Sequence, residues 1–548
     1  MLSWIFGQST PKQDTLSEPV RHDIVANLTA LRPEIEAILE NAGTAGCSLG
    51  VIHHGEIIHT DHFGFRDIEK GLKPDDNTIY PICSLSKSIT AATVGILVGD
   101  GEFDFDTRIS ELLADFNPED PMLKENGTLT DVLSHRSGLQ GSNFWLGSQN
   151  NVLFPAKDAM RVVNSLKMAH PFRTAWEYSN YGYEIVAHVI EQRTGKPWFE
   201  VISDRILKPL DMSRTGFDSQ FGAQDNVASA YATLDNATPV WIEGPKLSSH
   251  SILGAGGGIR SSLKDMLTFY RALLLAESDQ RRTGESTTTG SPFKNTKQQF
   301  ESHINLSGPL YGDTGYGFGL AQVTLPAPMG AIGTNPALLP DMPIVGRGLS
   351  PKVALYHQGT LAGAFATVIL FPETLSGIIV LTNSVPLAGS DDWIGQLVTE
   401  TLFDAPEKND YRTISKKTAD SQRGWHDRVV SQLPSSNGVG DQARPLGEYV
   451  GKYYNKAHTL LINIEEKDGS LVMNFQGHPQ EFYKLTWCSG DAFTWLSSRN
   501  ELASRGRFTR FGGWFYTIKF SADQSGRVVS LNWIHDEARK DGDDFYME

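Results

Sequence analysis

The chain has 548 residues, of which 40% are hydrophobic and 20% are charged, a balance typical of a globular protein. At that length we expect at least two domains. The formal net charge of -16 argues against nucleic acid or an anionic membrane as the main partner.

Residues 1–23 are predicted to form a polar leader, with helix beginning near Ile24. The leader lacks the basic segment and the long apolar stretch of a secretory signal. Elsewhere no run approaches the roughly 18 apolar residues of a membrane span. We therefore expect a cytoplasmic protein that does not contact a membrane.

Residues 24–404 combine strands at both ends with helices between them. The segment CSLGVIHHGEIIHTDHFGF predicts two strands joined by a turn near His54-Gly55. Helical periodicity follows, and strand patterns then return. Helices are predicted at 84–101, 181–195 and 261–275, and strands at 354–358, 364–371 and 376–382. This order predicts an α+β domain built on an antiparallel sheet. The polar segment 277–308 and the Pro- and Gly-rich segment 325–352 are predicted to be long loops.

The composition changes again over 405–445, which we interpret as a linker. After it, TLLINIEE and LVMNF flank Asp468-Gly469, a strong signal for a β-hairpin. WFYTIKF and VVSLNWIH flank a Gln-Ser-Gly turn in the same way. Residues 446–548 are therefore predicted to be a small all-β domain, a barrel.

Only three cysteines occur, Cys47, Cys83 and Cys488, and they form no C-x-x-C pair. Their number and spacing argue against a disulfide framework or a zinc cluster, so we expect no metal. Cys83 lies beside a candidate nucleophilic serine, but the neighbouring residues suit a serine mechanism better than a cysteine one.

That serine belongs to an S-x-x-K motif, Ser84-Leu-Ser-Lys87, which opens an apolar helical run. Side chains at i and i+3 of a helix are neighbours, so Lys87 is expected within reach of the Ser84 hydroxyl. A serine hydroxyl needs a base, and a buried lysine with a lowered pKa can be that base. The motif alone is common. It recurs at Ser9–Lys12, Ser261–Lys264 and Ser291–Lys294.

A second candidate element is Tyr178-Ser-Asn180, which precedes a predicted helix. The tyrosine can relay a proton, and the asparagine amide can orient the substrate and the lysine together. The alternative is an ordinary turn that caps the helix.

A third element, His357-Gln-Gly359-Thr360, follows a predicted strand. Its glycine permits close backbone approach. The amide N–H groups of Thr360 and Ser84 could form an oxyanion hole. A lone histidine at a strand end is otherwise structural.

The ordered set S-x-x-K, Y-x-N and H-x-G resembles the serine β-lactamase-related family, which includes class C β-lactamases, esterases, D-aminopeptidases and acyltransferases. Four further segments resemble it: Leu133-Ser-His-Arg-Ser-Gly-Leu139, Pro209-Leu-Asp-Met212, Gly256-Gly-Gly-Ile-Arg-Ser261 and Tyr316-Gly-Phe-Gly-Leu320. The resemblance covers roughly residues 24–404 and implies a β-lactamase/transpeptidase-like fold. The segment from Leu446 resembles a lipocalin-like domain, which stabilises some relatives and walls the active site of others.

The resemblance implies that Ser84 is acylated, that Lys87 and Tyr178 share the general-base and general-acid work, and that Asn180 holds the substrate. His357 stands where β-lactamases usually carry the lysine of K-T-G. Histidine is mostly neutral at pH 7, so we expect a weaker anchor for an anionic substrate. Small esters, amides or thioesters without a required carboxylate are the expected substrates, and His357 can instead assist proton transfer.

Three functional readings remain at this point. Hydrolysis of an ester or amide through an acyl-Ser84 intermediate leads, with no cofactor expected. Transfer of the acyl group to a small-molecule acceptor differs only in what attacks the intermediate. A catalytically inactive binding or scaffold protein is the alternative of another class. Phe144, Trp145 and Trp176 could line an apolar pocket or belong to the core.

Overall fold

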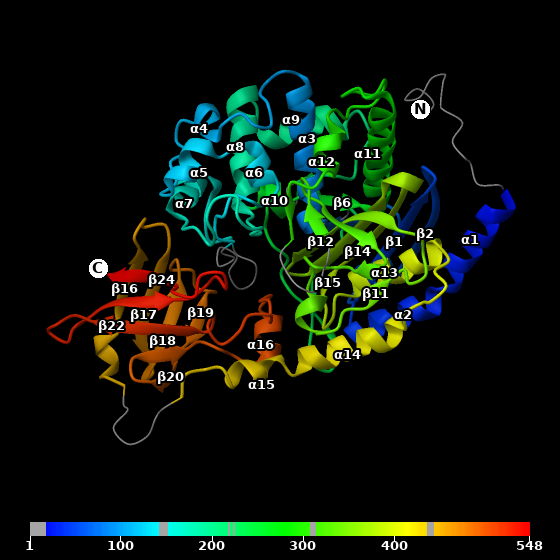
Figure 1. The fold of residues 1–548 in the computed structure, drawn as a ribbon. Helices are drawn as coiled ribbons and strands as arrows, with labels where there is room; N and C mark the ends of the chain where they lie inside the picture. The colour runs from blue at the N-terminus through cyan, green and yellow to red at the C-terminus, as the bar shows by residue number, and fades with distance from the viewer. Residues whose placement is uncertain (1–17, 142–151, 218–219, 223–224, 307–313, 436–442) are drawn as a thin grey trace.

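The computed structural model describes residues 18–548 apart from 142–151, 218–219, 223–224, 307–313 and 436–442. Figure 1 shows a larger α+β domain and, beside it, a smaller β domain drawn in orange and red. The helix α15 lies between the small domain and the rest of the chain (Figure 1).

The larger domain is organised by an eight-stranded antiparallel sheet with the order β2-β1-β14-β13-β12-β9-β8-β7. Its strands are β1 Gly46–His53, β2 Glu56–Gly64, β7 Ile304–Asn305, β8 Thr314–Tyr316, β9 Ala321–Leu325, β12 Lys352–Leu361, β13 Ala364–Phe371 and β14 Ser376–Thr382. Strands from the two ends of the domain thus pair directly, β1 with β14. The antiparallel sheet predicted from the sequence is confirmed.

Apolar side chains alternate across this sheet, so both of its faces are buried. Along β14, Ile378 and Val380 pack into the cluster that includes residues of the helices on one face. Ile379 and Leu381 belong to the cluster of the opposite face. The first face is covered by helices from both ends of the domain: α1 Glu18–Ala30, α2 Arg32–Ala42, α13 Ser390–Leu402 and α14 Tyr411–Arg423.

Helices also cover the other face and form a helical subdomain above it (Figure 1). They are α3 Ser86–Gly99, α4 Ile109–Leu112, α5 Pro121–Asn126, α6 Leu129–Leu133, α7 Ala159–Ser165, α8 Tyr181–Thr194, α9 Trp198–Ile202, α10 Gly254–Gly257, α11 Leu263–Thr283 and α12 Thr296–Phe300. The helix α11 therefore extends into the segment predicted as a polar loop. Short strands complete the domain: β3 Ile79–Pro81, β4 Tyr231–Thr233, β5 Pro239–Trp241, β6 Arg260–Ser262, β10 Ala327–Pro328, β11 Ile344–Val345 and β15 Ser384–Val385.

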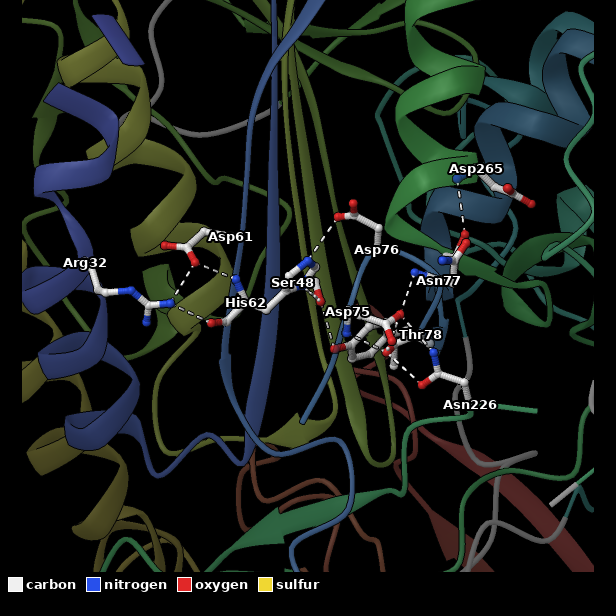
Figure 2. Close-up of polar contacts among 12 residues, drawn as sticks. Arg32, Ser48, Asp61, His62, Asp75, Asp76, Asn77, Thr78, Asn226 and Asp265 are labelled. Atoms are coloured by element: carbon white, nitrogen blue, oxygen red, sulfur yellow. Dashed lines mark hydrogen bonds and ion pairs between the residues drawn. The ribbon is translucent and has the colours of Figure 1, made fainter. Parts of the chain in front are cut away.

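A polar network fixes β3, the strand that leads to Ser84. The Ser48 hydroxyl on β1 lies 2.9 Å from His62 Nδ1 and 3.0 Å from the Tyr80 hydroxyl on β3. The other ring nitrogen of His62 lies 3.0 Å from Asp76 (Figure 2). These bonds join the edge of the main sheet to β3, so the turn that follows β3 has a fixed position.

The small domain is a nine-stranded antiparallel sheet with the order β19-β18-β17-β16-β24-β23-β22-β21-β20. Its elements are β16 Gly451–Asn455, β17 Leu461–Lys467, β18 Ser470–Phe475, β19 Phe482–Lys484, β20 Thr486–Ser489, β21 Ala492–Thr494, α16 Arg499–Ser504, β22 Thr517–Ala522, β23 Val528–Trp533 and β24 Asp543–Met547. Only Leu485 separates the two edge strands β19 and β20, so the sheet closes on itself almost completely. The predicted lipocalin-like barrel is confirmed.

The predicted hairpin turn at Asp468-Gly469 joins β17 to β18. Both residues have positive φ angles, 50° and 68°, as a two-residue turn of this kind requires. The segment predicted as a linker, 405–445, is partly helical, since it contains α14 and α15 Trp425–Val430. The helix at the start of the chain begins at Glu18, earlier than Ile24.

Candidate active site

The nucleophile candidate Ser84 sits in a 3₁₀ turn, Cys83–Leu85, immediately before α3. Cys83 is fully buried and has a φ of 52°, a left-handed conformation that is uncommon for a residue with a side chain. Its Sγ lies 3.5 Å from the Ala364 carbonyl. The contact of Cys83 with β13 therefore fixes the turn, and Ser84 lines a cavity.

Lys87 lies one helical turn further along and is completely buried. Its Nζ lies 3.2 Å from Ser84 Oγ, 2.8 Å from Asn180 Oδ1 and 2.6 Å from the carbonyl oxygen of Gly256. No acidic side chain appears among these three partners. Burial therefore lowers the pKa of Lys87 well below that of a free lysine.

Tyr178 approaches the same hydroxyl from the segment before α8. Its phenol donates a 2.8 Å hydrogen bond to Ser84 Oγ, and Lys87 Nζ lies 4.8 Å from the centre of its ring. Burial raises the pKa of Tyr178, so the phenol keeps its proton at neutral pH. The structure thus brings Ser84, Lys87, Tyr178 and Asn180 together.

Gly359 and Thr360 lie on β12, which passes close to the Ser84 turn. A Cβ atom at Gly359 would lie 2.7 Å from Cys83 Cβ and 3.0 Å from the Ser84 amide nitrogen. Glycine is therefore required for the strand to approach the nucleophile's backbone. Thr360, the next residue, lines the same cavity as Ser84.

His357 also lies on β12, but its ring is buried among other side chains. Its Nδ1 lies 2.6 Å from the Gln358 carbonyl, so this nitrogen carries the proton. Its Nε2 then accepts from the Tyr316 hydroxyl at 3.0 Å. Burial lowers the pKa of His357 to about 3, so the ring is neutral. His357 is not among the described residues that line the cavity. Its role in proton transfer stays a prediction.

The cavity at Ser84 has a volume of about 280 Å³ and is formed by both domains. The larger domain contributes, among others, Trp176, Leu253, Ile332 and Gln358. The barrel contributes Trp495, Gly506, Arg507, Phe508, Arg510, Phe511, Phe515 and Tyr516. Trp176 thus lines the cavity, whereas Phe144 and Trp145 lie outside the described residues.

A second cavity of about 750 Å³ adjoins the first. The residues that line both are Tyr178, Gly333, Phe508, Arg510 and Phe511. The barrel segment 508–511 therefore forms part of the wall between them. Substrate bound at Ser84 would contact residues of both domains.

Sequence reasoning missed several of these contacts. The Gly256 carbonyl and Tyr316 belong to segments that resemble the family, yet their contacts with Lys87 and His357 carry no motif of their own. The only sign in the sequence that the barrel contributes to the cavity is the aromatic segment FTRFGGWFY at 508–516. Such a run is also what a barrel core requires, so the sequence did not separate the two uses.

Within the described part of the chain, no group of three or more His, Cys, Asp or Glu side chains is placed to hold a metal ion. None of the helices there is long and apolar enough to cross a membrane.

Comparison with known protein families gives a match of the β-lactamase family model to residues 31–401. The chain belongs to the β-lactamase family. A second model, a domain of unknown function (DUF3471), matches residues 437–544, which include most of the barrel. The β-lactamase/transpeptidase-like fold predicted for the larger domain is confirmed.

Several relatives of this β-lactamase-family chain carry names of hydrolases. An unguisins hydrolase from Aspergillus violaceofuscus is 26% identical over 477 residues, covering 82% of this chain and 79% of the relative. A D-aminopeptidase from Cereibacter sphaeroides is 26% identical over 257 residues, 44% of this chain and 46% of the relative. Together with the family match, these relatives identify the chain as a serine hydrolase.

Two solved structures share the fold over nearly the whole chain. The octameric penicillin-binding protein homologue from Pyrococcus abyssi superposes with a TM-score of 0.53 at 18% identity, covering 96% of this chain and 98% of that one. SurE superposes with a TM-score of 0.52 at 19% identity, covering 96% and 99%. At these identities the likeness concerns the fold alone.

Proposed function

We propose that this enzyme hydrolyses an ester or amide bond of a small molecule through an acyl-Ser84 intermediate. The observation that carries the proposal is the set of three Lys87 contacts. Burial lowers the pKa of Lys87 and so favours its neutral amine, in which Asn180 Oδ1 and the Gly256 carbonyl, as acceptors only, take the two N–H groups. The lone pair of that amine is then left for the third partner, the Ser84 hydroxyl.

In the acylation step, Ser84 Oγ attacks the substrate carbonyl and its proton passes to Lys87. A C–O bond forms to Ser84, and the negative charge on the carbonyl oxygen is met by the amide N–H groups of Ser84 and Thr360. The bond to the leaving group then breaks. Tyr178 relays the proton from Lys87 to that group, since its phenol already contacts Ser84 Oγ.

In the second step a water molecule attacks the acyl-Ser84 carbonyl, and the same lysine and tyrosine take and return the proton. Ser84 is regenerated and a carboxylic acid is released. Aromatic side chains such as Trp176, Trp495 and Phe515 line the cavity beside polar ones, which favours a substrate that combines an apolar body with polar groups. The three unpaired cysteines suit a reducing compartment, and we place the enzyme in the cytoplasm on that ground.

The test is hydrolysis of a p-nitrophenyl ester series by the wild type and by Ser84→Ala, with and without an added alcohol or amine. We expect the wild type to release p-nitrophenol and free acid in equal amounts, and Ser84→Ala to show only background. A product ester or amide that replaces the acid would assign the enzyme to acyl transfer instead.

A further inference from the structure

Two arginines of the barrel line the cavity at Ser84, and their surroundings differ. Arg507 is neutralised within the barrel. Its Nη2 lies 2.9 Å from the carboxylate of Glu481, which is buried. Its Nε donates to the Tyr483 hydroxyl at 2.7 Å. The charge of Arg507 therefore serves the barrel's own structure.

Arg510, three residues further on, has no such counterion among the residues that the structure describes. It is accessible to solvent and lines both cavities. Within the described part of the chain, no residue forms an ion pair or a hydrogen bond with it. Its guanidinium instead lies 5.0 Å and 5.3 Å from the ring centres of Phe508 and Phe511.

The groups that act on Arg510 electrostatically do not compensate its charge. They are the phenols of Tyr178 and Tyr516, whose pKa values burial raises, so both are neutral at pH 7. Desolvation by the cavity walls lowers the pKa of Arg510 itself, but an arginine stays protonated at any physiological pH. A cation thus faces the cavity beside Tyr178.

Among the described residues, three acidic side chains line the second cavity: Glu177, Asp536 and Glu537. Glu177 lies 3.2 Å from His170 Nε2. Burial and the charges of Asp536 and Glu537 raise the pKa of Glu177 to about 7. These carboxylates repel each other, and none of them lies within ion-pair distance of Arg510 in the described structure. They leave the cavity's cation available to a ligand.

We propose that Arg510 binds a carboxylate of the substrate and that the enzyme therefore prefers esters or amides that carry one near the bond it cleaves. An arginine fork matches a carboxylate with two parallel hydrogen bonds, and the rings of Phe508 and Phe511 lie beside this fork. The anchor comes from the barrel, whereas the expectation drawn from His357 alone was a weaker anchor for an anionic substrate. The inference rests on the proposed function and specifies its substrate class.

The experiment compares two esters of equal length, p-nitrophenyl hexanoate and mono-p-nitrophenyl adipate, which differ by a terminal carboxylate. We measure kcat/KM for both with the wild type, Arg510→Gln and Arg510→Lys. The control is Arg527→Gln, which removes an exposed arginine in the turn between β22 and β23 that does not line either cavity. Thermal unfolding of each variant reports whether the barrel is intact.

We expect the wild type to favour the adipate ester. Arg510→Gln should lower kcat/KM for that ester about tenfold or more and change the hexanoate ester much less. Arg510→Lys should lose part of the preference, because it keeps the charge but not the fork. An adipate-to-hexanoate ratio that is the same in the wild type, Arg510→Gln and Arg527→Gln would overturn the proposal.

A second measurement separates this proposal from the function on which it rests. We follow labelling of Ser84 by a fluorophosphonate in the presence of hexanoate or of neutral hexanamide. Protection by hexanoate that exceeds protection by hexanamide, and that is lost in Arg510→Gln, supports the anchor even without turnover. Normal labelling with equal protection contradicts the anchor alone, whereas no labelling of Ser84 contradicts the proposed hydrolysis.

Discussion

At the scale of single residues, the decisive group is the Lys87 amine. A free lysine is protonated at pH 7 and has no lone pair to give. Lys87 is buried with two backbone or amide oxygens and one hydroxyl, and among the described residues no carboxylate bonds to it. Its charged form is therefore disfavoured, and the neutral form is the one that can accept the Ser84 proton.

We accordingly predict that kcat/KM rises with pH along a limb set by a pKa well below 10.5, because acid protonates Lys87 and removes the base. Lys87→Arg should lower kcat/KM by about 10²- to 10⁴-fold, since a guanidinium does not give up its proton. The measurement is a pH–rate profile of a neutral ester.

The matched control is Lys264→Arg, in the S-x-x-K sequence Ser261–Lys264, where the lysine is exposed. It should leave the profile unchanged. If kcat/KM of Lys87→Arg rises with pH as in the wild type and reaches the same value, another group is the base.

At the scale of elements, β12 and the turn before α3 form one unit. Gly359 allows the strand to pass the turn, since a Cβ there would meet Cys83 Cβ at 2.7 Å and the Ile82 carbonyl at 3.1 Å. The strand carries Thr360 to the cavity and buries His357 behind it. Strand and turn come from positions more than 270 residues apart, roughly half the chain.

We predict that Gly359→Ala lowers kcat/KM at least about tenfold and costs ~1–3 kcal/mol of stability, because the new methyl group displaces the strand from the Ser84 backbone. Urea unfolding and steady-state kinetics measure the two effects. Gly447→Ala is the control, since a Cβ there meets nothing within 4 Å. Full activity in Gly359→Ala would mean that the close approach does not shape the site.

What the sequence predicts at this scale follows from how local the signal is. The turns at His54-Gly55 and Asp468-Gly469 are each predicted from two adjacent residues, and both residues of each turn have positive φ angles. The S-x-x-K spacing likewise predicts that Lys87 reaches Ser84. By contrast, His357 on β12 is buried against Tyr316 on β8 because β12, β9 and β8 are neighbours in the sheet. No local sequence pattern indicates that order of strands.

At the scale of the whole molecule, the barrel and the helices before it complete the cavity. Gln422 on α14 donates to the Thr509 carbonyl at 2.7 Å, and Trp425 on α15 donates to the Phe511 carbonyl at 3.0 Å. The barrel segment that separates the two cavities is thus held by helices in the region predicted as a linker. The sequence could not show this, because contacts between domains leave no periodic pattern.

We predict that Trp425→Phe, which keeps an aromatic side chain but removes the indole N–H, raises hydrogen exchange across residues 508–513. It should lower kcat/KM about fivefold, the equivalent of ~1 kcal/mol. The control is Trp241→Phe, at a tryptophan that is 58% exposed. Unchanged exchange in Trp425→Phe would mean that the segment keeps its position without α15.

The central claim is that one buried amine activates one hydroxyl, and a single measurement tests it most directly. Mass spectrometry of the folded protein after a short reaction with an activated ester or a fluorophosphonate locates any adduct on the chain. The account predicts one adduct, on Ser84, formed much more slowly in Lys87→Arg and absent in Ser84→Ala. An adduct on another residue, or labelling of Ser84 at the same rate in Lys87→Arg, would contradict it.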